Sequence, residues 1–132
     1  MLKKDGIFAK PIKDIQPFTF DDHVADVFPD MLRRSIPGYA TSLSMIELFA
    51  NRIGKADTNM YDLGCSLGAA TSALCSGIEQ DGITIFAVDN SEAMIRRSKE
   101  NFKQQTNAEL QFICADIRDI EIKNASLVIL NY

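Results

Sequence analysis

The chain is best read outward from nine consecutive residues, Met60-Tyr61-Asp62-Leu63-Gly64-Cys65-Ser66-Leu67-Gly68. An apolar run near 59–63 meets a carboxylate, Asp62, and two glycines then frame a short loop. Glycine lets the backbone turn tightly and approach a neighbouring helix or a ligand closely. Small residues follow Gly68, and a helix is expected over 68–78. The stretch therefore predicts the first strand–loop–helix unit of a parallel α/β sheet.

A second apolar run, over 83–88, ends in another acid, Asp89. Asp89 follows Gly68 by about 20 residues, the offset at which an acid accepts hydrogen bonds from ribose hydroxyls in dinucleotide-binding sheets. The alternative is that Asp89 caps the next helix, although Asn90 or Ser91 can fill that position. The glycine loop and Asp89 together predict an adenosine-containing ligand at the carboxyl edge of the sheet.

Strands and helices alternate from residue 56 onward. Further strands are expected near 109–114 and 126–131, with a helix over 91–104 between the second and third strands. This alternation predicts an α/β fold with a doubly wound parallel sheet in a domain spanning 56–132. Residues 127–130 are all apolar, as in a strand buried on both faces. Because such a strand would otherwise be an exposed edge, we expect 1–132 to be the amino-terminal half to two thirds of a longer protein.

Residues 1–55 are expected to form an amino-terminal arm and helical cap. The arm covers 1–20, and a helix begins at Asp21 that Pro29 should break or restart. Ile36-Pro37-Gly38 predicts a turn. A second helix follows over 41–52, and its apolar side is expected to contain Leu43, Ile46, Leu48, Phe49 and Ile53.

Composition limits the possible functions. The 132 residues are 46% hydrophobic and carry a formal net charge of -4, which disfavours a general nucleic-acid-binding surface. No apolar run is long enough to span a bilayer. Cys65, Cys75 and Cys114 lack metal-type spacing and lie in or beside apolar segments. They predict buried free thiols, no metal site and a reducing, cytoplasmic location.

Two more polar residues fall at the same predicted sheet edge. Asp116 could accept a hydrogen bond from the exocyclic amine of adenine while the Ile117 amide donates to a ring nitrogen. The alternative is a surface turn in which Asp116 pairs with Arg118. Asn131 ends the fourth strand and points to the same crevice. His23, the sole histidine, is read as a surface or capping residue, and no catalytic base is identified.

Asp62-Leu63-Gly64-Cys65, Asp89 and Asp116-Ile117 together resemble the Rossmann-like fold of class I S-adenosylmethionine-dependent methyltransferases, with Ser66 where that fold has a third glycine. The segments 27–31, 34–39 and 116–120 also resemble the carboxy-S-adenosyl-L-methionine synthase family. Members of that family make carboxy-S-adenosyl-L-methionine from S-adenosyl-L-methionine and prephenate, releasing phenylpyruvate. A separate enzyme uses the product to modify the wobble uridine of tRNA.

The resemblance also implies roles for individual residues. It places Gly64, Cys65 and Ser66 at the amino-acid end of the ligand, Asp89 and Asn90 at the ribose, and Asp116 and Ile117 at the adenine. Tyr39 and Asn131 would reach the sulfonium side, near the added carboxylate. The family is homodimeric and holds that carboxylate with an arginine from its second half, beyond residue 132. Two alternatives stay open: an ordinary methyltransferase that uses the same residues, or a non-catalytic domain that binds an adenosyl ligand.

Overall fold

Four parallel strands form the sheet, in the order β3-β2-β1-β4. The computed structural model describes residues 2–7, 9–11, 14 and 17–132. The strands are β1 (Asn59–Leu63), β2 (Thr84–Asp89), β3 (Glu109–Cys114) and β4 (Ala125–Ile129), so all four predicted strands are confirmed. The register pairs Leu63 with Val88 and Asp89 with Cys114, which brings the carboxyl ends of β1, β2 and β3 to one edge. Strand order reverses between β1 and β4, and in such sheets ligands bind at that reversal.

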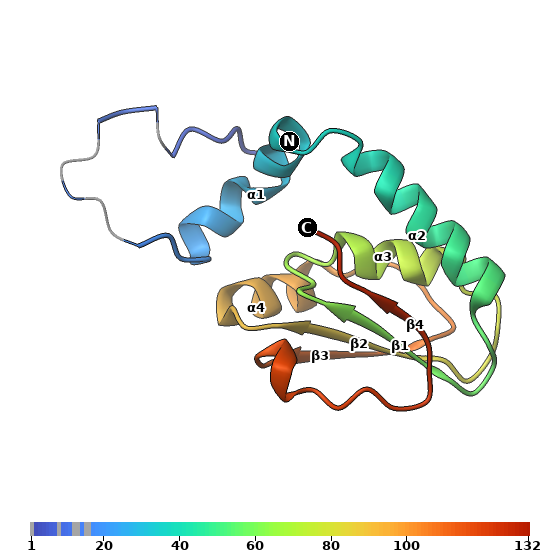
Figure 1. Cartoon of the computed structure of the whole chain (residues 1–132). Helices are drawn as coiled ribbons and strands as arrows, with labels where there is room; N and C mark the ends of the chain where they lie inside the picture. Colours follow the sequence, from blue (N-terminus) through green and yellow to red (C-terminus); the bar gives the residue numbers. More distant parts are fainter. Residues whose placement is uncertain (1, 8, 12–13, 15–16) are drawn as a thin grey trace.

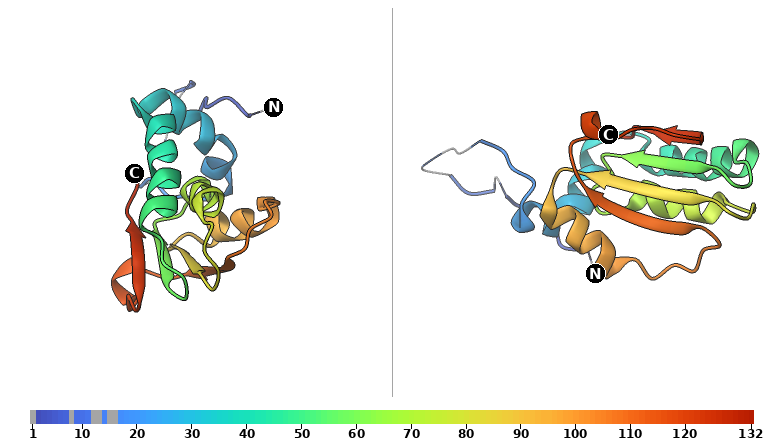
Figure 2. Two further views of the ribbon diagram at one scale, coloured as in Figure 1. Left: turned by 90° about the vertical axis from the view of Figure 1, so that its right-hand side faces the viewer. Right: turned by 90° about the horizontal axis from the view of Figure 1, so that it is seen from below.

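The main helices are α1 (Asp22–Ser35), α2 (Tyr39–Ile53), α3 (Ala69–Gly77) and α4 (Glu92–Asn101), and a 3₁₀ turn, η1, spans Ile117–Asp119. Helices α2, α3 and α4 cover the same face of the sheet (Figure 1). Figure 2 shows α1 lying beyond the carboxyl ends of the strands. Helix α1 therefore lies at the edge of the sheet where a ligand is expected.

The main core lies between this face of the sheet and α2 and α3. Met60, Leu74 and Ile85 are fully buried there. A Cβ atom on Gly77 would lie 2.1 Å from the carbonyl oxygen of Glu47, so α3 can approach α2 this closely only because residue 77 is glycine. Close packing of α2 on α3 fixes the start of α2, where Tyr39 lies, relative to the sheet.

The structure corrects two helix predictions. Helix α1 runs unbroken through Pro29. Val24, Ala25 and Phe28 before the proline, and Met31 and Leu32 after it, pack in one cluster with Met94 of α4, and this packing outweighs the lost hydrogen bond. The predicted apolar side of α2 is only partly buried, since Leu48, Phe49 and Ile53 are exposed. Helix α2 is buried instead along a narrow stripe of Ile46 and Ala50 that faces α3 and the sheet.

Two burial predictions can be compared with the structure. Residues 127–130 have the apolar sequence of a strand buried on both faces, and the sequence predicted that this strand would be an exposed edge unless further strands cover it. Leu130, directly after β4, is 71% exposed, and Val128 of β4 is 38% exposed. The reason is the position of β4 at the edge of the sheet, where β1 is its one neighbouring strand among the described residues. Cys65 and Cys75 are buried free thiols as expected, but Cys114 is exposed because β3 is the other edge strand.

Candidate functional site

The glycine loop after β1 is held against the end of β2. The amides of Gly64 and Cys65 both donate to the carbonyl oxygen of Val88, each at 2.8 Å. Gly64, Ser66 and Gly68 all have positive φ angles, of 81°, 50° and 88°. A Cβ atom on Gly64 would meet no other atom within 4 Å. The loop therefore presents open space beside Gly64, into which a ligand can approach the backbone.

Asp89 joins this loop to the start of α4. Its Oδ2 atom accepts from the Ser66 amide and its Oδ1 atom accepts from the Ser91 amide, both at 2.9 Å. Ser91, and not Asp89, caps α4 by accepting from the Met94 amide. Because a carboxylate oxygen can accept more than one hydrogen bond, both oxygens keep capacity for ligand hydroxyls.

A hollow of about 160 Å³ opens at the strand-order reversal. Five of the nine predicted site residues line it: Tyr39, Gly64, Cys65, Ser66 and Asn131. Its apolar lining includes Phe28, Leu32, Leu43 and Leu67. The sequence did not predict these four as site residues, because an apolar pattern in a helix or loop does not show which side chains face a ligand. Ligand pockets usually measure about 300–1,000 Å³, so this hollow can enclose only part of an adenosyl ligand.

The other four predicted residues, Asp89, Asn90, Asp116 and Ile117, do not line the hollow. Asp89 ends β2 and Asn90 follows it, while Asp116 and Ile117 come after β3, farther along the same sheet edge. Asp116 pairs with Arg118 at 2.6 Å, and the hydrogen bonds from Arg118 lower the pKa of the Asp116 carboxyl to about 2. That pairing is the alternative left open by the sequence, and contact with adenine stays a prediction. Ile117 is 38% exposed, so its amide lies on an accessible turn.

A buried acid of β1, Asp62, lies two residues before the glycine loop. Asp62 is 1% exposed and accepts from the Thr71 hydroxyl at 2.6 Å. Burial raises the pKa of Asp62 to about 6 despite that hydrogen bond. Burial, with a smaller effect of Asp62, raises the pKa of the Tyr39 hydroxyl. Sequence reasoning gave Asp62 no site role, although a carboxylate directly before the glycine loop was visible. Asp62 and Asp89 bring negative charge close to the glycine loop, while Arg33 brings a positive charge to the lining of the hollow.

Cys65 is unsuited to be a nucleophile. Burial, and then the charges of Asp62 and Asp89, raise the pKa of its thiol above the usual value. A thiol attacks as the thiolate, and this environment keeps it protonated. Cys65 therefore contributes a wall to the hollow.

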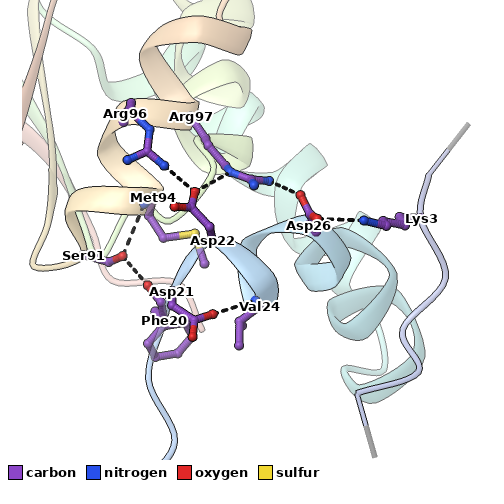
Figure 3. A network of polar contacts seen from close by, with 10 residues as sticks. All are labelled: Lys3, Phe20, Asp21, Asp22, Val24, Asp26, Ser91, Met94, Arg96 and Arg97. Carbon is purple, nitrogen blue, oxygen red and sulfur yellow. Dashed lines mark hydrogen bonds and ion pairs between the residues drawn. The ribbon is translucent and has the colours of Figure 1, made fainter. Parts of the chain in front are cut away.

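Helix α1 is anchored over the hollow by α4. Figure 3 shows Arg96 and Arg97 directed at Asp22, with Asp26 between Arg97 and Lys3. Arg97 lies 3.1 Å from Asp22, and Lys3 lies 2.8 Å from Asp26. Because α1 also brings Phe28 and Leu32 to the hollow, these ion pairs fix one of its walls.

The described part of the chain contains no cluster of three or more His, Cys, Asp or Glu side chains that could hold a metal ion. Among the residues described, no helix is both long enough and apolar enough to cross a bilayer.

The chain is similar in sequence to a known protein family and to several curated proteins. The family model described as "Methyltransferase domain" matches residues 60–131. A carboxy-S-adenosyl-L-methionine synthase from Vibrio atlanticus (strain LGP32) is 51% identical over 133 residues, which cover 100% of this chain and 55% of the relative. The protein of the same name from Pasteurella multocida (strain Pm70) is 48% identical, over 99% of this chain and 55% of the relative. The chain thus spans about half the length of the curated relatives it matches.

Solved structures give the fold alone. A Methanococcus maripaludis protein assigned to the S-adenosyl-L-methionine-dependent methyltransferases superposes with a TM-score of 0.58, at 23% identity, over 87% of this chain and 52% of that one. An S-adenosylmethionine-dependent methyltransferase from Clostridium acetobutylicum ATCC 824 superposes with a TM-score of 0.54 at 22% identity. The match covers 76% of this chain and 39% of that one. The sheet, with its reversal beside β1, is that of these enzymes, which agrees with the predicted fold class.

Proposed function

Because this chain belongs to the methyltransferase domain family, we propose that it binds S-adenosyl-L-methionine and acts in a carboxy-S-adenosyl-L-methionine synthase. The observation that carries the proposal is the agreement of two independent features. Relatives of that name match the chain from end to end at about half identity. The glycine loop, with Asp62 and Asp89 beneath and beside it, suits a cationic sulfonium ligand.

In this proposal the hollow takes the amino-acid and sulfonium end of the ligand. Gly64, Cys65 and Ser66 contact the amino-acid end, and Tyr39 and Asn131 lie at the sulfonium side. The open space beside Gly64 is where a side chain would obstruct the ligand. The nucleoside then extends along the sheet edge, with its ribose at Asp89 and Asn90 and its adenine at Asp116 and Ile117.

The co-substrate proposed is prephenate, with phenylpyruvate released and carboxy-S-adenosyl-L-methionine formed. The family resemblance and the names of the relatives support this reading. The same resemblance supports a cytoplasmic homodimer whose product feeds the modification of the wobble uridine of tRNA. No described side chain is assigned as a base, so the role proposed for these residues is to orient the ligand and exclude water.

An ordinary methyltransferase would bind the same ligand through the same residues, and the names of the relatives disfavour it. The two readings differ in the ligand that the protein retains. We expect protein purified from bacterial cells and then denatured to release a compound heavier than S-adenosyl-L-methionine by one carboxyl group, detected by mass spectrometry. Release of plain S-adenosyl-L-methionine, or of no adenosyl compound, would contradict the proposal.

A matched pair of variants tests the site. Asp89→Ala removes the acceptor proposed for the ribose diol and should weaken ligand binding at least about tenfold, or about 1.4 kcal/mol. Asp81→Ala removes an equal charge from an exposed loop before β2, at the other end of the strand, and should leave binding unchanged. Equal affinities of the two variants in calorimetry would remove Asp89 from the site.

A further inference from the structure

We propose that Ser98 of α4 is a positioning residue that holds the peptide of Ser66 in place at the ligand site. The proposal rests on the proposed function, because it assigns Ser98 a part in binding S-adenosyl-L-methionine. Ser98 does not line the hollow, so it would act through Ser66 and not by touching the ligand. Three observations lead to this assignment.

Ser98 is buried beneath the glycine loop. It is 2% exposed, and its hydroxyl donates to the carbonyl oxygen of Ser66 at 2.8 Å. A serine inside a helix commonly donates to the carbonyl one turn back in its own helix. Ser98 instead donates to a loop 32 residues earlier in the chain. A Cβ atom on Gly68 would lie 3.4 Å from the Ser98 hydroxyl, so α4 packs directly against this loop.

Ser66 needs such support because of its backbone conformation. Its φ angle is 50°, in the left-handed region that non-glycine residues rarely adopt. Residues in that region keep their conformation only when the surroundings impose it. The Cys65 thiol also approaches the Ser66 carbonyl oxygen, but at 3.8 Å a thiol is a weak donor. The Ser98 hydroxyl is the stronger of the two contacts.

The same residue is tied to Asp89 through its amide. Ser66 donates to Asp89 Oδ2 at 2.9 Å while its carbonyl accepts from Ser98. A continuous path of hydrogen bonds thus runs from α4 through Ser66 to the end of β2. Loss of the Ser98 hydroxyl would free Ser66 and leave Asp89 less well oriented, and both residues are proposed to contact the ligand.

The first test needs no ligand. Amide exchange followed by NMR should show the Ser66 amide exchanging about tenfold faster in Ser98→Ala, with the amides of β2 unchanged. Ser98→Cys keeps a weak donor and should restore part of the protection. Ser44→Ala is the control, because the Ser44 hydroxyl donates to the Ala40 carbonyl within α2, away from the loop. Unchanged exchange at Ser66, or equally faster exchange throughout the sheet, would overturn the proposal.

The second test measures binding. Calorimetry with S-adenosyl-L-homocysteine should show affinity about tenfold lower for Ser98→Ala, with partial recovery in Ser98→Cys and no change in Ser44→Ala. Equal affinities of wild type and Ser98→Ala would overturn the positioning role. If the wild-type protein binds no adenosyl ligand, the proposed function fails, and the exchange experiment still decides whether Ser98 holds the loop.

Discussion

The buried acid Asp62 is expected to make the stability of this fold depend on pH. Asp62 lies at the end of β1, nearly inaccessible to water, with the Thr71 hydroxyl as its hydrogen-bond donor. Burial disfavours the ionised carboxylate, so its pKa is raised from 3.8 to about 6. The ionised carboxylate therefore destabilises the protein at this position when no positive charge balances it.

The sign of the effect follows from the raised pKa. Between pH 3.8 and about 6 the folded state holds a proton on Asp62 that the unfolded state has lost. Stability contributed by this group is therefore complete below pH 3.8 and falls as the pH rises toward about 6, by about 3 kcal/mol in all. We expect Asp62→Asn to lack that decline in urea denaturation series measured across this range.

The quantity to compare is how steeply the free energy of unfolding falls with pH in the two proteins. Their absolute stabilities also differ, because asparagine changes the hydrogen bonding around Thr71. Groups that titrate elsewhere in the molecule affect both proteins equally and cancel. Parallel pH profiles for wild type and Asp62→Asn would show that Asp62 titrates normally. Asp57→Asn makes the same side-chain change in an exposed turn and serves as the control.

Single residues differ in how far the sequence predicts them. The tight turn at Gly64 and the position of Asp89 at the end of β2 could be predicted, because both depend on the neighbouring residues in the sequence. For Asp116 the sequence left two interpretations, contact with adenine or an ion pair with Arg118. A side chain two residues away can compete with a ligand for the same carboxylate. The contact between Ser98 and Ser66 gave no local signal, because it depends on how α4 packs under the loop.

At the level of elements, α1 is attached more weakly than the helices behind the sheet. It packs through a small separate cluster of Val24, Ala25, Phe28 and Met94, with exposed ion pairs around it. Exposed ion pairs contribute little and weaken with salt. Helix α1 also forms one wall of the hollow, so its attachment bears on access to the site.

Arg97 is the group that joins α4 to both Asp22 and Asp26 (Figure 3). We expect Arg97→Gln to speed amide exchange along α1 while the amides of β1 and β2 keep their protection. Salt at about 0.5 M should change the wild type in the same direction, because it screens the same charges. Lys123→Gln breaks the pair with Glu121, away from α1, and serves as the control. Equal protection of α1 in both variants would show that apolar packing alone holds the helix.

The sequence predicted element types well and their exposed faces poorly. Strands β1 and β2 were found because apolar runs ending at an acid or a glycine are local patterns, and β4 was found because residues 127–130 are all apolar. Pro29 was misread since the rule for proline ignores packing against Met94. Phe49 and Ile53, assigned to the apolar side of α2, are exposed, since helical periodicity shows that a face is apolar without showing what covers it.

In the whole molecule, the two edges of the sheet are unlike. Strand β3 exposes Glu109 and Gln111, polar side chains that oppose pairing with another strand. Strand β4 exposes Val128, and Leu130 directly after it is also exposed. The neighbouring face of α2 exposes Met45, Phe49 and Ile53. We call these five residues the α2–β4 edge. An apolar surface of this kind, beside unpaired backbone groups, favours association.

We therefore expect this 132-residue chain to self-associate through the α2–β4 edge, with the associated fraction rising with concentration in sedimentation velocity. Replacing Val128 and Leu130 together by threonine keeps strand propensity while removing apolar surface, and should shift the equilibrium toward monomer. Leu2→Thr removes a comparably exposed leucine from the amino-terminal arm and should leave association unchanged. A wild-type chain that is monomeric at every concentration would contradict the prediction. Association that persists equally in the double variant would locate the interface elsewhere, since the β4 edge would then be unnecessary for it.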